Sequence, residues 1–417
     1  MLNPPLSLLS FDLLEYVVEF VAPSKRDLRN LSLADRAFTQ LCQNHIFGTL
    51  GLGYCSDTKK QFKKELGRIK RILAKKPSIY RRIRIIQLSI SHRFNAWLLK
   101  DKTLTKIFLR LSKCRIRPSI LHLEFPLAME DPILVVDRLR QTFFLETLTT
   151  LHLTACQEMP LAIFLTCHRL KEVVLEDVTA LDDGYDDFPA RQCSDYTSPA
   201  LEKFQYRASH TLVEQMIAPP PIFPVPVVLW SSLRVLELSP FERHEMACLQ
   251  AIVSAASDTL EELYLTQPRT VTRGYYQLWP LREYLDLSGT IYLRAFALAA
   301  IIEPETKTPD ILHDISLVLG TIAGLNLMKS LSFTLTVFER EPVQDILDQD
   351  WDALCQEVVR ISSGKPLDFD LNMDFGVYPG LNETTLIQQS ILSLRIAEEM
   401  DVLRSTPNIL FHMADPT

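Results

Sequence analysis

The sequence predicts an α/β protein in which a three-helix N-terminal unit is followed by an irregular repeat solenoid, with parallel strands on one face and helices on the other. Residues 1–50 contain three apolar helical patterns, separated by stop and start signals. From about residue 80 the pattern L-x-x-L-x-L returns at irregular intervals. The composition, 47% hydrophobic and 23% charged over 417 residues, is ordinary for a globular chain with a sizeable core.

The N-terminal helices are bounded by recognisable capping residues. Ser10 is a candidate N-cap for the first helix, and Pro23 stops that helix. Ser24 and Asp27 give the start signal of the second helix, and a third is expected from about Asp35 to Leu50. Their apolar content exceeds what three short helices can bury among themselves. We therefore expect part of this surface to be covered by a partner.

The repeat pattern predicts strands with one buried and one solvated face. Its anchors lie at Ile83, Leu121, Leu148, Leu170, Leu201, Leu233, Leu260 and Met328. The repeats that start at 148, 170, 201, 233 and 260 are 22, 31, 32 and 27 residues apart, which fits a strand plus a helix or loop per repeat. In the six full repeats from residue 148 onward, fifteen of the eighteen alternating positions are polar or charged.

Helices are expected between these strands at about 160–168, 244–258, 343–362 and 383–404. The stretch 281–287 shifts the pattern by one residue, and 288–327 is expected to hold one further repeat. The acidic segment 182–199 and the proline run 218–226 are expected to be loops between repeats. The expected organisation is thus a helical domain (1–52), a basic helical connector (53–80) and a repeat domain (81–417).

Charge is distributed very unevenly along the chain. Residues 59–117 hold 20 Lys and Arg against Glu65 and Asp101, a net charge of +18, whereas the whole chain carries −7. The stretch has the features of a phosphate-binding surface, of a surface matched to an acidic protein, or of a solvated face. Its few aromatic residues fall at apolar spacing, and the acidic whole does not favour general nucleic-acid binding.

No motif for catalysis or metal binding stands out. His244 and Glu245 begin an H-E-x-x-H pattern, but Cys248 occupies the second histidine position, and a His–Glu pair on a helix surface is the commoner arrangement. We therefore expect no catalytic residue, no metal, no cofactor and no enzyme activity. The eight cysteines show no CxxC spacing, and neither a signal peptide nor a membrane-spanning segment is recognisable. These features favour an intracellular protein, in the cytoplasm or nucleus, with reduced thiols.

The N-terminal unit resembles an F-box. The matching segments are Leu9–Leu14 with Val17, Phe20 and Val21, then Asp27-Leu28, then Leu33–Phe38, and finally Phe47 and Leu50. Ser10 stands where the F-box pattern has proline, and Asp35 where it has cysteine. Together with the repeats, the layout is similar to fungal F-box proteins with degenerate leucine-rich repeats.

The resemblance implies a substrate-receptor subunit of an SCF-type cullin–RING ubiquitin ligase. The F-box would bind a Skp-type adaptor, which links it to the cullin and RING subunits. The residues expected at the adaptor are Leu9, Leu13, Leu14, Val17, Leu28, Leu31 and Phe38. The polar strand positions are expected to hold the target protein, with candidates at Thr150, His152, Glu172, Glu176, Lys203, Arg207, Glu237, Glu262 and Tyr264.

Two other functions remain open at this point. One is a scaffold that binds the adaptor without promoting ubiquitination. The other is a protein that binds nucleic acid through the basic stretch 59–117 and dimerises through its N-terminal helices. Neither the identity of the target nor the partner of the basic stretch follows from the sequence.

Overall fold

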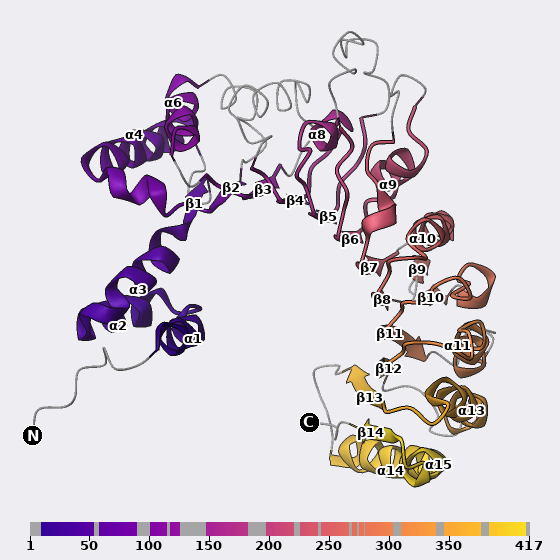
Figure 1. Ribbon diagram of the computed structural model, residues 1–417. Coiled ribbons are helices and arrows are strands. Elements are labelled where there is room, and N and C mark those ends of the chain that lie inside the picture. Colours follow the sequence, from indigo (N-terminus) through magenta and orange to yellow (C-terminus); the bar gives the residue numbers. More distant parts are fainter. Residues whose placement is uncertain are drawn as a thin grey trace, which may run out of the picture. The chain divides into compact units, whose positions relative to one another are not determined.

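The computed structural model shows an α/β protein whose larger sheet is parallel (Figure 1). It describes residues 10–53, 58–89, 101–114, 117–125, 147–181, 197–220, 226–240, 243–266, 269–272, 275–278, 280–302, 310–338, 346–376 and 383–413. The chain forms two compact units, the first of residues 1–170 with 177–199 and the second of 171–176 with 200–417. No helix within these described stretches is long and apolar enough to cross a membrane.

The first unit begins with three helices and continues into parallel strands. Its helices are α1 (Phe11–Val21), α2 (Lys25–Ala34), α3 (Arg36–Gly48), α4 (Lys59–Lys75), the 3₁₀ helix η2 (Pro77–Arg81), α6 (Lys102–Ser112) and α8 (Ala162–Leu165). Its strands are β1 (Thr49–Leu52), β2 (Ile85–Ser89), β3 (Ile120–Glu124) and β4 (Thr150–Thr154), paired in that order.

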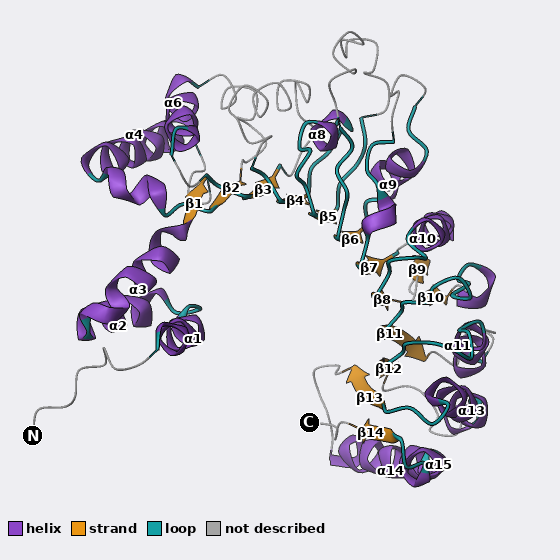
Figure 2. Ribbon diagram, in the orientation of Figure 1, coloured by secondary structure: helices purple, strands orange, loops and turns teal. Residues whose placement is uncertain are grey.

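The second unit continues the alternation of strand and helix. Its parallel strands, in sheet order, are β5 (Glu172–Glu176), β6 (Lys203–Arg207), β7 (Val235–Ser239), β8 (Glu262–Thr266), β11 (Ala295–Ile302), β12 (Ser330–Phe338), β13 (Leu367–Gly376) and β14 (Ile409–Met413). Its helices are α9 (His210–Ile217), α10 (Arg243–Ala255), α11 (Ile311–Gly320), α13 (Trp351–Ser362), α14 (Glu383–Glu399) and α15 (Asp401–Ser405), with short 3₁₀ helices η6 (Trp230–Ser232) and η7 (Leu281–Glu283). Helices α9, α10, α11 and α13 lie along one side of these strands (Figure 2).

The predicted repeat anchors form the core of both units. Each anchor precedes or lies within a strand, and the eight strands expected from them are all present. The apolar positions of β2, β3 and β5–β8 are buried and the alternating positions are more exposed, which confirms the expected two-faced strands. Phenylalanines of three neighbouring strands also meet edge to face in the second unit, Phe296 with Phe333 and Phe333 with Phe369.

The structure also holds strands that the pattern missed. The repeat expected within 288–327 is β11, and β1, β13 and β14 continue the sheet where no repeat was assigned. Residues 281–287, in contrast, begin with η7 and contain no strand. An antiparallel pair, β9 (Arg269–Thr272) with β10 (Tyr275–Leu278), lies between β8 and β11 in the chain. Most of segment 182–199 and of the run 218–226 lies outside the described residues.

The helix boundaries follow the predicted capping residues. Ser10 accepts a hydrogen bond from the Leu13 amide, and Ser24 accepts one from the Asp27 amide. The second helix ends at Ala34, and Asp35 then caps α3 by accepting from the Ala37 amide at 2.8 Å. Strand β1 is followed by Gly53, whose φ is 95°; a Cβ there would meet the Ser89 carbonyl oxygen at 1.7 Å. Glycine is therefore required for the close approach of this turn to β2.

Candidate docking surfaces

Helix α1 carries two apolar stripes on different sides. Leu14 and Val18 are buried in the core of the three-helix unit, and Val21 packs against them. Leu13, Tyr16, Val17 and Phe20 follow the spacing i, i+3, i+4 and i+7, which places them on one face of the helix. Their exposed fractions are 52%, 69%, 36% and 82%. Phe11, at the start of the helix, is also exposed.

The residues expected at the adaptor divide between this surface and the core. Leu13 and Val17 lie on the exposed stripe, and Leu31 is partly buried against the core. Leu14, Leu28 and Phe38 are instead buried inside the three-helix unit, where they hold its helices together. We correct their assignment accordingly: a residue that the unit itself covers offers no surface to a partner. Leu9 lies outside the described residues.

Tyr16 and Phe20 were missing from the expected contact set, although the sequence contained the signal. An amphipathic helix of eleven residues needs one apolar stripe to join a small bundle. The sequence of α1 has enough apolar residues for two. Leu33, at the end of α2, is also exposed.

Arg82 ties the three-helix unit to the segment that follows. Its guanidinium donates to the Gln40 carbonyl oxygen, the Gln40 side chain and the Asn44 side chain of α3, at 3.2, 2.9 and 2.8 Å. Burial lowers the pKa of this guanidinium. Arg82 thus has a structural task within the basic stretch 59–117.

In the first unit, the exposed strand face carries a row of ring and amide side chains. His122 of β3 and His152 of β4 are paired in register, and their rings stack with centroids 4.2 Å apart. Gln87 of β2 lies 3.4 Å from His122 Nδ1. His152 therefore lies on a continuous polar row, as expected. Thr150 is buried at the start of β4, so it is removed from the candidate target-binding positions.

In the second unit, the candidate target-binding residues are largely paired with one another. Lys203 lies 3.3 Å from Glu172, and the Gln205 amide donates to Glu237 at 3.0 Å. The Tyr264 hydroxyl donates to Glu262 at 2.9 Å. These contacts link neighbouring strands or neighbouring exposed positions. Glu176 and Arg207 lie at register positions opposite each other and are exposed.

The exposed face changes character toward the C-terminal strands. The outward positions of β12 carry Ser330, Ser332, Thr334 and Thr336. On β13 they carry Asp368, Asp370, Asn372 and Asp374, all exposed. Sequence reasoning did not identify this row because Gly364 stands at the first leucine position of the L-x-x-L-x-L pattern, before Leu367 and Phe369. The strand face of the second unit therefore offers a mixed, internally paired part and an acidic part.

Glu245 is not on a helix surface, contrary to the sequence expectation. Its side chain is buried, with His210 Nδ1 of α9 at 3.5 Å. Cys248 is also buried, and the pKa of its thiol rises to about 11, mainly through desolvation. The contact between His210 and Glu245 joins α9 to α10. Among the described residues, no group of three or more His, Cys, Asp or Glu side chains is placed to hold a metal ion.

No protein-family model matches this chain, and a search of the curated proteins found no match.

Proposed function

We propose that this chain is the substrate-receptor subunit of a cullin–RING ubiquitin ligase, with α1–α3 bound to a Skp-type adaptor and a target protein on the exposed strand face. The observation that carries the proposal is the second apolar stripe of α1, formed by Leu13, Tyr16, Val17 and Phe20. It lies within the segment that resembles an F-box.

The stripe has the form of a helix-in-groove anchor. Large apolar side chains at i, i+3, i+4 and i+7 are the contacts that an amphipathic helix lays into a partner's groove. Each such side chain, once covered, contributes about 1.5–3 kcal/mol. The buried stripe of Leu14 and Val18 meanwhile fixes α1 on α2 and α3. A partner would therefore meet a preformed surface.

The receptor acts by proximity in this proposal and forms no bond itself. It holds a target close to the ubiquitin carrier that the cullin and RING subunits recruit, which raises the effective concentration of a target lysine. The strand faces support this role because most of their outward side chains are polar and lie on regular ladders. A rigid row of this kind presents many contacts in fixed register.

Recovery of the adaptor from a lysate of a eukaryotic cell tests the proposal. We expect the wild-type chain to recover a Skp-type adaptor, and Leu13→Asp and Phe20→Asp to lose it. Leu394→Asp is the matched control, because Leu394 is an exposed leucine of α14. Leu14→Asp is unsuitable since it places a charge in the core of the three-helix unit.

The outcomes separate the alternatives. Adaptor recovery that both α1 variants retain at the wild-type level would show that this stripe is not the contact. Recovery of adaptor without cullin favours the scaffold that does not promote ubiquitination. Circular dichroism of each variant confirms that the helices are intact, so that a loss of binding reports on the surface alone.

A further inference from the structure

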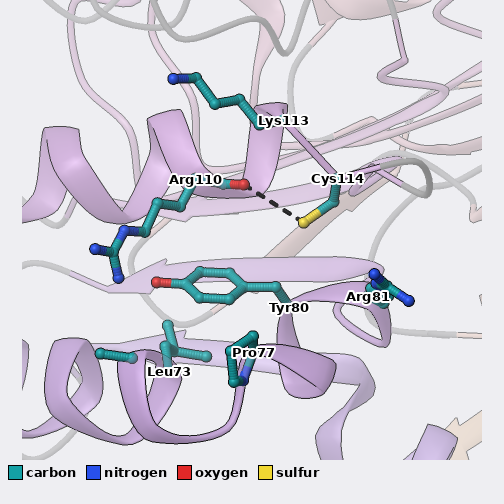
Figure 3. A pocket seen from close by; sticks show the side chains of 8 residues that line it. Leu73, Pro77, Tyr80, Arg81, Arg110, Lys113 and Cys114 are labelled. Carbon is teal, nitrogen blue, oxygen red and sulfur yellow. Dashed lines mark hydrogen bonds between the residues drawn. The ribbon is translucent and has the colours of Figure 1, made fainter.

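A cavity of about 970 Å³ lies where α4, η2 and α6 meet in the first unit (Figure 3). This volume is at the upper end of the range of small-molecule sites, about 300–1,000 Å³. It is lined by Leu73, Ala74, Pro77, Tyr80, Arg81, Arg110, Lys113 and Cys114. All eight belong to the basic stretch 59–117, whose charge the proposed function leaves unexplained.

The lining of the cavity is cationic. Arg81, Arg110 and Lys113 are exposed, and none of the described lining residues carries a carboxylate. Cys114 adds no negative charge, because burial raises the pKa of its thiol, and the thiol donates to the Arg110 carbonyl oxygen at 3.4 Å. Helices α4 and α6 both end here, and cations at helix C-termini are stabilised by about 0.3–1 kcal/mol. That effect accounts for Arg110 and Lys113. Arg81 is the last residue of η2, whose five residues supply a much smaller dipole.

Tyr80 supplies a second and independent indication of a ligand. Its side chain is buried, with 5% of the residue exposed. Within the described part of the chain, its hydroxyl has no hydrogen-bond partner. A buried hydroxyl without a hydrogen-bond partner destabilises the folded state by about 1–3 kcal/mol. In Figure 3 the ring lies between Leu73 and Pro77 on one side and the α6 side chains on the other, with Arg110 beside its hydroxyl end.

We propose that this cavity binds an organic phosphomonoester. The phosphate carries a charge of about −1.5 to −2 and strong acceptor oxygens, which suits three cationic side chains and one unsatisfied hydroxyl donor. Guanidinium groups bind phosphate in bidentate fashion, so Arg110, which lies beside the Tyr80 hydroxyl, holds the phosphate together with Lys113, the C-cap residue of the same helix. Arg81 lies at the opposite end of the Tyr80 ring in Figure 3 and adds positive charge to the cavity. The hydroxyl of Tyr80 donates to it once Arg110 moves onto the ligand. The organic part lies against Leu73, Ala74 and Pro77.

Calorimetric titration of the full chain with phenyl phosphate tests this site. At about 0.15 M salt, where exposed charges are screened, we expect phenyl phosphate to bind more tightly than inorganic phosphate because its ring covers the apolar wall. Arg110→Gln should weaken binding about tenfold or more, the value of one charge-assisted hydrogen bond. Tyr80→Phe should weaken binding by about three- to tenfold without lowering the melting temperature, because it removes an unsatisfied hydroxyl.

Lys106→Gln is the matched control. Lys106 lies one turn before Arg110 on α6, is exposed and does not line the cavity. Its loss removes the same charge from the same helix, so affinity should stay within about twofold. Equal weakening by Lys106→Gln and Arg110→Gln would reduce the effect to net charge and overturn the site.

Alkylation of Cys114 gives a readout at the cavity itself. We expect bound phenyl phosphate to slow the reaction of Cys114 with N-ethylmaleimide, followed by peptide mapping, and Arg110→Gln to abolish the protection. Absence of both heat and protection at 10 mM phenyl phosphate overturns the proposal. So does binding of a single-stranded RNA that depends on Arg110 while phenyl phosphate fails to bind, since that result indicates a nucleic-acid surface. A phosphotyrosine peptide distinguishes a protein-borne phosphate from a free metabolite: both carry the proposed chemistry, and the tighter binder identifies the source.

Discussion

Helices α1 and α13 have nearly the same length, but α13 buries its apolar residues whereas α1 leaves many of its own exposed. In α13, Trp351, Leu354, Cys355, Val358 and Ile361 are all buried. In α1, Leu14 and Val18 are buried, but the second stripe of Leu13, Tyr16, Val17 and Phe20 remains open. The repeat array supplies a neighbouring helix, α11, to cover α13. The described helices α2 and α3 supply no such cover for the second stripe of α1, which is why we place the partner surface there.

Truncation of one leucine in each helix is the strongest test of this contrast. Leu354→Ala should lower the free energy of unfolding by about 2–5 kcal/mol, because it leaves a cavity in a fully buried site. Leu13→Ala should change it by less than about 0.5 kcal/mol, since an exposed side chain loses few contacts. Chemical denaturation of both variants measures the difference. Equal losses would mean that α1 is as well covered as α13, and would remove the basis of the proposed function.

The reactivity of a cysteine in α13 tests the burial of that helix without a mutation. The pKa of Cys355 in α13 rises to about 12, first through desolvation and then through Asp352 and Glu399. At pH 8 only about one Cys355 in 10⁴ is then a thiolate, the reactive form. We expect Cys355 to react more than about a hundredfold more slowly with iodoacetamide than the partly exposed Cys114. Peptide mapping follows each thiol, and rapid labelling of Cys355 in the folded chain would show that the α13 face opens readily.

Much of the repeat domain could be predicted because each strand is marked by the pattern of its own residues. Leucine anchors with polar residues between them indicate strands with two different faces, and the strands expected from Leu148, Leu170, Leu201, Leu233 and Leu260 are present. β11 was not located because its alternating positions are the alanines Ala295, Ala297 and Ala299 instead of polar residues. β13 was not located because Gly364 stands at the first leucine position of the pattern. Their parallel pairing with β12 is what identifies them, and pairing between distant segments is invisible to local periodicity.

The candidate surfaces were less predictable because exposure depends on neighbours. Leu13 and Leu14 are adjacent leucines in the sequence, yet one is half exposed and the other is in the core. Only the docking of α1 onto α3 decides between them. The unsatisfied Tyr80 hydroxyl likewise arises from the packing of α4, η2 and α6. In the sequence alone, Tyr80 has the spacing of a residue on the apolar face.

Removal of the Arg82 contacts tests how firmly the three-helix unit is attached within the first unit. Arg82→Ala should lower the free energy of unfolding by about 1 kcal/mol, since its three hydrogen bonds to Gln40 and Asn44 are partly exposed. Arg84→Ala is the control, as Arg84 is an exposed arginine two residues on. Hydrogen exchange should quicken at the end of α3 in the first variant alone. Unchanged exchange would mean that β1 pairing by itself holds this junction.

The last expected effect concerns the helix caps at two positions where the sequence differs from the F-box pattern that it resembles. Asp35 stands where that pattern has cysteine and accepts from the Ala37 amide at 2.8 Å, whereas Ser10 stands where it has proline and accepts from the Leu13 amide at 3.4 Å. Loss of a cap costs about 0.5–2 kcal/mol. We expect Asp35→Ala near 1 kcal/mol and Ser10→Ala below it, because the Ser10 hydrogen bond is long and exposed. Thermal denaturation monitored by circular dichroism measures both. A larger loss for Ser10→Ala would indicate that α1 depends on its cap more than on Leu14 and Val18, and hence that its exposed stripe is presented by a frayed helix rather than a fixed one.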